Sequence, residues 1–102
     1  MQIIWSSYSK KCLRNMYSYY KNDAGESVAK KISNQIFDAT KYLKQYPESG
    51  SIEPLLVDCD QEYRYCIAGN YKIIYTIIDG MLLISDVFYT RQNPVKINKP
   101  NR

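Results

Sequence analysis

Few types of side chain in this sequence are available for chemistry. The 102 residues contain no histidine, so the side chain that most often exchanges protons at neutral pH and binds metals is missing. Cys12, Cys59 and Cys66 are widely spaced and form no Cys-x-x-Cys pair, which argues against a disulfide framework and against a structural zinc site. Any catalysis would therefore use lysine, arginine, tyrosine or carboxylate side chains, and we expect neither a metal nor a cofactor.

The last third of the chain contains the elements that would position these side chains. Residues 71–78 and 81–89 are apolar and β-prone, and Asp79-Gly80 between them is typical of a two-residue hairpin turn. Residues 63–68 form a third strand, joined to the second by Gly69-Asn70. The pattern predicts an antiparallel three-strand meander.

Two-residue turns fix the register of this meander, with Ile78 opposite Met81 and Ala68 opposite Tyr71. Because side chains alternate along a strand, every residue is assigned to one of two faces. The more apolar first face, which helices would cover, contains Arg64, Cys66, Ala68, Tyr71, Ile73, Tyr75, Ile77, Leu82, Ile84, Asp86 and Phe88. The second face contains Tyr63, Tyr65, Ile67, Lys72, Ile74, Thr76, Ile78, Met81, Leu83, Ser85, Val87, Tyr89 and Arg91. We expect the second face to meet a partner; the alternative is that the chain's own C-terminal tail covers it.

The first half of the chain predicts a short strand followed by two helices. Residues 2–5 are β-prone, and Ser6-Ser7 offers N-cap oxygens for a helix over about 8–21. A second apolar stripe at helical spacing covers about 26–46 and stops at Pro47. Asp23 and Glu26 have the spacing of a capping box for this second helix. Two helices so close in sequence are expected to pack as an antiparallel hairpin.

These elements make the fold class α+β: a strand, a two-helix hairpin and an antiparallel three-strand meander, with the helices on one face of the sheet. The length suits one domain, which we expect over residues 1–97 with a polar tail over 98–102. No stretch approaches the roughly 18 apolar residues of a membrane span, so we expect a cytoplasmic protein without membrane contact.

Charge is distributed unevenly along the chain. Residues 1–46 carry eight Lys or Arg and three acids, whereas residues 47–62 carry five acids and no base. The segment 47–61, which also contains Pro47, Gly50 and Pro54, predicts an irregular acidic loop. Residues 63–102 carry six bases and two acids, so the positive charge is divided between the helices and the strands and suits a polyanion or an acidic protein.

The order and spacing of several short motifs resemble the RelE/ParE superfamily of bacterial type II toxins over residues 2–97. The motifs are Trp5-Ser6, Leu43-x-x-Tyr46-Pro47-x-x-Gly50, Tyr63-Arg64, the run from Gly69 to Tyr75, and Val87-x-x-x-Arg91-Gln92-Asn93-Pro94. The resemblance implies a plasmid-stabilisation toxin that an antitoxin protein neutralises. It leaves open whether the free toxin inhibits DNA gyrase, as ParE-like members do, or cuts mRNA in the translating ribosome, as RelE-like members do. A third possibility is a non-toxic relic that only binds its antitoxin.

For the nuclease alternative, the resemblance assigns catalysis to Lys72, Arg91 and Tyr89. Cleavage by a ribose hydroxyl needs a proton acceptor, cationic stabilisation and a donor to the leaving oxygen. Tyr63 and Tyr65 stand where RelE-like nucleases carry lysines, and this departure favours the ParE-like branch. Arg64 is then a binding arginine or a structural clamp to Asp86 or the acidic loop. The residues predicted to bind antitoxin or target are Arg64, Tyr63, Tyr65, Ile74, Leu83 and Val87.

Overall fold

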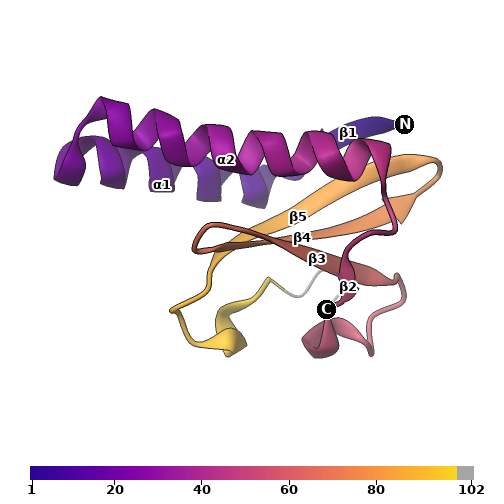
Figure 1. The fold of residues 1–102 in the computed structure, drawn as a ribbon. Coiled ribbons are helices and arrows are strands. Elements are labelled where there is room, and N and C mark those ends of the chain that lie inside the picture. Colours follow the sequence, from indigo (N-terminus) through magenta and orange to yellow (C-terminus); the bar gives the residue numbers. More distant parts are fainter. Residues whose placement is uncertain (99–102) are drawn as a thin grey trace.

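The protein has two layers, a helix hairpin and a sheet, in a computed structural model that describes residues 1–98. The five-stranded sheet has the order β1-β5-β4-β3-β2. Its strands are β1 (Gln2–Trp5), β2 (Ser51–Ile52), β3 (Tyr63–Ala68), β4 (Tyr71–Ile78) and β5 (Met81–Tyr89). Helices α1 (Ser7–Ala24) and α2 (Glu26–Gln45) run antiparallel over one face of the sheet (Figure 1). The predicted α+β class is confirmed.

The ends of the helices follow from local sequence. Ser6 caps α1 as predicted, because its Oγ accepts a hydrogen bond from the backbone N–H of Ser9 at 3.0 Å. The predicted capping box of Asp23 and Glu26 is wrong. Helix α1 continues through Asp23, and Gly25, with φ +98°, makes the turn between the helices without a side-chain cap.

Two features of the sheet were not predicted. Strand β1 pairs in parallel with β5, placing Trp5 beside Ile84, so the first strand joins the far edge of the meander. Strand β2 lies inside the segment predicted to be irregular and pairs antiparallel with β3. The three meander strands have the predicted bounds, and both two-residue turns are present.

The main core lies between the helices and the sheet. Met16 of α1 and Ile36 and Leu43 of α2 pack against strand residues and are at most 5% exposed. Their partners on the sheet include Ile73, Tyr75, Leu82 and Ile84, which are fully buried. The predicted helix-covered face is confirmed up to Ile84.

Beyond Ile84, a β-bulge in β5 reverses the predicted faces. Ile74 pairs with Asp86 but Tyr75 pairs with Ile84, so Ser85 is an extra residue in β5. A shift of one residue moves each following side chain to the opposite face. Val87 and Tyr89 therefore pack on the helix side and Phe88 on the other side, and their predicted faces are wrong.

The chain itself covers part of the second face of the sheet, including Tyr63 and Ile74, so the expected open partner surface is wrong there, whereas Ile67 on the same face is 56% exposed. A short 3₁₀ helix, η1 (Pro54–Leu56), and the C-terminal η2 (Pro94–Lys96) lie on the side opposite the helices (Figure 1). The small second core that they close contains Leu56, Tyr63, Ile74, Phe88 and Ile97. Of the predicted polar tail, only Asn98 belongs to the described residues.

Candidate functional site

Lys72, the first predicted catalytic residue, is held in an ion pair. Its Nζ lies 2.7 Å from Oε1 of Glu53, whose side chain is fully buried, while the Lys72 side chain is 20% exposed. The same Nζ lies 4.2 Å from the centre of the Tyr65 ring. Oε2 of Glu53 accepts the backbone N–H of Leu55 at 3.1 Å. The charge of Lys72 is thus neutralised, and its contacts fasten η1 to the sheet.

The other two predicted catalytic residues lie elsewhere. Because of the bulge, Tyr89 faces the helices, where its ring stacks at a tilt 5.5 Å from that of Tyr71. Arg91 is exposed in the turn after β5. Lys72 and Tyr89 therefore lie on opposite faces of the sheet, and the structure does not bring the predicted catalytic set together.

Arg64 clamps the loop that follows α2. Its Nη1 donates to the carbonyl oxygens of Gly50 at 2.7 Å and Glu48 at 3.2 Å. Its Nη2 lies 3.1 Å from a carboxylate oxygen of Glu62. These contacts favour the structural interpretation of Arg64, with the acidic loop rather than Asp86 as its partner.

The buried Tyr75 hydroxyl holds the same loop from the other side. It donates to the carbonyl of Pro47 at 2.7 Å and accepts the N–H of Gly50 at 3.0 Å. A Cβ at Gly50 would lie 2.5 Å from this hydroxyl oxygen, so only glycine fits. The spacing Tyr46-Pro47-x-x-Gly50 thus has a structural cause.

The remaining predicted binding residues are buried or half-buried. Tyr63 is 3% exposed and Ile74 is fully buried in the second core. Tyr65 and Leu83 are half-buried. Val87 is 5% exposed on the helix side, where it helps to line a groove.

This groove, of about 520 Å³, lies between α1 and the C-terminal end of β5, and sequence reasoning did not identify it. The tyrosine spacing along α1 was visible, but the bulge that turns Val87 and Tyr89 toward that helix was not. Its lining residues are Tyr8, Cys12, Asn15, Met16, Tyr19, Tyr20, Tyr71, Val87, Tyr89 and Gln92. Five tyrosines in one groove offer aromatic area together with hydroxyl groups for hydrogen bonds.

The electrostatics of the groove favour binding over proton transfer. Burial and a hydrogen bond with Tyr20 raise the pKa of Tyr71, and burial and the carboxylate of Asp86 raise the pKa of Tyr8. Burial also raises the pKa of the Cys12 thiol. These groups stay neutral near pH 7, so none of them is a ready base or thiolate nucleophile.

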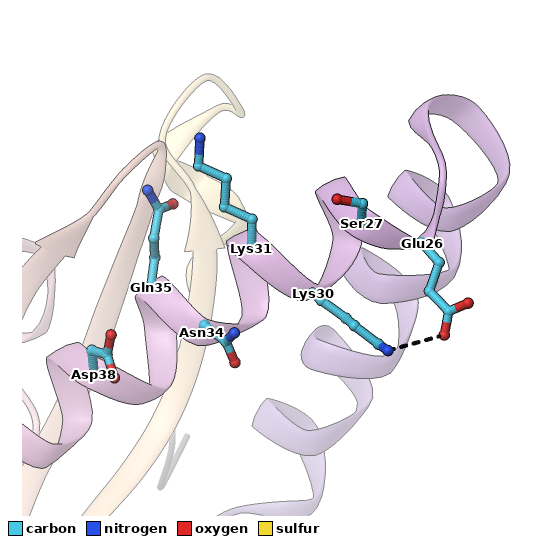
Figure 2. A pocket seen from close by; sticks show the side chains of 7 residues that line it. All are labelled: Glu26, Ser27, Lys30, Lys31, Asn34, Gln35 and Asp38. Carbon is cyan, nitrogen blue, oxygen red and sulfur yellow. Dashed lines mark ion pairs between the residues drawn. The ribbon is translucent and has the colours of Figure 1, made fainter.

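A second hollow, of about 660 Å³, is lined by α2 alone (Figure 2). Its lining includes Glu26 and Lys30, an exposed ion pair with a separation of 3.5 Å. An exposed ion pair of this kind contributes little to the stability of the fold. The hollow is an open surface of one helix.

Residues 1–98, which the structure describes, contain neither of two features that would point to another class of site. No group of three or more His, Cys, Asp or Glu side chains in this range is placed to hold a metal ion. No helix in it is long and apolar enough to cross a membrane.

The comparisons with known proteins bear on the family and the fold of the chain. The family model described as "ParE toxin of type II toxin-antitoxin system, parDE" matches residues 3–94. The fold is similar to "Chromosomal ParDE TA system from P. aeruginosa", with a TM-score of 0.74 and 17% identity, over 89% of this chain and 97% of that one. It is also similar to "The structure of YoeB dimer from Staphylococcus aureus", with a TM-score of 0.56 and 17% identity, over 87% of this chain and 95% of that one. No curated protein matches the chain.

At these identities the two solved structures show the fold alone. The family model is a stronger finding, because it spans nearly the whole described chain, from β1 to the start of η2. The chain therefore belongs to the ParE toxin family of type II toxin-antitoxin systems.

Proposed function

We propose that this protein is a cytoplasmic toxin that inhibits DNA gyrase by binding to it, and that a cognate antitoxin neutralises it. The observation that carries the choice of target is the ion pair of Lys72 with buried Glu53. A nuclease would need a cation free to stabilise the phosphate and a proton acceptor beside it. Lys72 is committed to Glu53, and Tyr89 lies on the opposite face.

The tyrosine groove is the docking site that we propose for the antitoxin. Helix α1, which forms one wall, carries Lys10, Lys11, Arg14 and Lys21 and only one acid, Asp23. An acidic amphipathic segment would bury apolar side chains against Met16 and Val87 and place its carboxylates near the basic helix. The neutral tyrosine hydroxyls would supply hydrogen bonds.

The test compares two assays on the purified chain. We expect the protein to reduce supercoiling by gyrase and to trap gyrase–DNA cleavage complexes, and added antitoxin to reverse both effects. Primer extension on a translated message should show no codon-phased breaks. Unchanged supercoiling at saturating protein, together with breaks that Arg91→Ala abolishes, would instead establish the RelE-like endoribonuclease.

A further inference from the structure

Three large apolar side chains are exposed at the end of β2 and in the loop that joins it to β3. Ile52 is 44%, Leu55 42% and Val57 69% exposed. Apolar side chains scattered singly over a surface need no explanation, but these three lie within six residues around η1. Figure 1 shows η1 beneath the sheet, on the side away from α1.

The loop is firmly anchored although its side chains are exposed. Leu56, which lies between Leu55 and Val57 in the sequence, is 1% exposed and packs in the second core. The backbone N–H of Glu53 donates to Tyr63 at 2.8 Å, and that of Cys59 donates to Leu56 at 3.1 Å. The ion pair with Lys72 adds a side-chain anchor. A loop fixed in this way loses little conformational entropy on binding, which favours recognition.

A hollow of about 290 Å³ opens beside these side chains. Its lining includes the apolar residues Ile52, Leu56 and Val57 and the acidic residues Asp60 and Glu62. Arg64 occupies one oxygen of Glu62, and the segment 47–62 contains no lysine or arginine. A long cationic side chain matches this composition, because its methylene stem packs on apolar walls while its charged end meets carboxylates.

We infer that this hollow binds an arginine or lysine side chain of the toxin's target, and that the β2–β3 loop is the toxin's contact with that target. The inference rests on the proposed function, because an enzyme that holds the DNA polyanion presents basic surfaces. The occupant is thus a basic, partly apolar segment of gyrase. An acidic antitoxin segment is repelled by this loop and attracted to the basic α1, so the two partners use surfaces of opposite charge.

The first experiment measures the affinity of the full-length toxin for purified gyrase. Val57→Ser removes exposed apolar area, and Asp60→Lys reverses the charge at the hollow. Each should weaken gyrase binding about tenfold or more, as expected for residues at the centre of an interface. The matched controls are Val95→Ser, at a valine that is 74% exposed in η2, and Asp38→Lys, at an exposed position of α2. The controls should bind gyrase within about twofold of the parent, and all four variants should keep antitoxin affinity and melting temperature.

Equal gyrase affinity for the parent, Val57→Ser and Asp60→Lys would overturn the inference and leave the proposed function standing. If the parent protein does not bind gyrase, the proposed function fails, and a second probe decides on the hollow. Titration of the labelled toxin with a short synthetic peptide of arginine and leucine should shift the NMR signals of Ile52, Val57 and Asp60, and Asp60→Lys should remove these shifts. Shifts elsewhere, or none, would contradict a cation-binding hollow.

Discussion

Nζ of Lys72 on β4 and Oε1 of Glu53 beside η1 lie 2.7 Å apart, and the carboxylate is fully buried. This pair explains two properties of the protein at once. It fastens the β2–β3 loop across the second face of the sheet, and it neutralises the charge of Lys72, one of the two cations in the predicted catalytic set. Burying a carboxylate is costly unless a partner compensates its charge, so the two residues depend on each other.

Removal of Lys72 should therefore destabilise the fold. Lys72→Ala leaves the Glu53 carboxylate buried without its cation, and we expect a loss of about 3–5 kcal/mol in the free energy of unfolding. Lys30→Ala breaks the exposed ion pair with Glu26 and should change the free energy of unfolding by less than about 1 kcal/mol. Urea denaturation of both variants checks this. Similar small losses in the two would show that the Glu53 pair contributes no more than a surface contact.

The close approach of Gly50 to Tyr75 predicts a steric effect. In Gly50→Ala, the new Cβ would lie 2.5 Å from the Tyr75 hydroxyl oxygen and 2.7 Å from the Tyr65 carbonyl oxygen. Overpacking of this kind costs about 1–3 kcal/mol. Tyr75→Phe removes the contact with the hydroxyl oxygen, while the contact with Cε1 of the ring, at 2.9 Å, remains. The double variant should therefore be more stable than the sum of the single losses predicts. Strict additivity in thermal denaturation would contradict the clash.

Asp86 predicts a pH dependence of stability. Burial raises the pKa of its carboxyl, although the N–H of Asn98, 2.9 Å from Oδ2, and Cys12 act in the opposite direction. Because the native pKa exceeds the unfolded value of about 3.9, the stabilising contribution is complete below that pH. It is lost as the pH rises through the native pKa. Asp86→Asn keeps an oxygen acceptor for Asn98 but cannot ionise.

Unfolding of the parent protein and of Asp86→Asn, each measured over a range of pH, tests this prediction. The free energy of unfolding of the parent minus that of Asp86→Asn should fall as the pH rises from about 4 toward neutrality. A difference that stays constant, or that grows with pH, would show that the Asp86 pKa is not raised in the native state.

Tyrosines at the mouth of the α1–β5 groove should contribute to antitoxin affinity. Tyr19, 61% exposed, and Tyr8, 43% exposed, can be truncated to alanine with little effect on the core. We expect each change to weaken binding by about 2 kcal/mol, which is roughly 30-fold. Tyr42→Ala, at an α2 position that is 57% exposed and outside the groove, serves as the matched control. Titration calorimetry should give a lower antitoxin affinity for the two groove variants than for Tyr42→Ala. Equal affinities of all three variants would show that the antitoxin binds outside the groove.

The sequence was sufficient for β1, the three meander strands, the helix hairpin and the turns, because these depend on local periodicity and on residues such as Gly80 and Ser6, but it did not predict β2. The sequence was insufficient for the groove between α1 and β5, because the groove depends on one extra residue in β5. Ser85 gives no local signal of a bulge, yet it determines whether Val87 and Tyr89 face the helices. The pairing of Lys72 with Glu53 joins residues far apart in sequence, and neither residue type nor spacing predicts it.

We propose that this toxin acts on gyrase by binding and not on RNA by catalysis. The most direct test incubates purified gyrase, plasmid DNA and ATP with increasing toxin and quantifies the cleavage complexes released as linear DNA after protein digestion. We predict that linear DNA increases with toxin concentration and that antitoxin prevents the increase. Linear DNA that stays at the level without toxin, under conditions where ribosome-bound messages are cut, would contradict the claim.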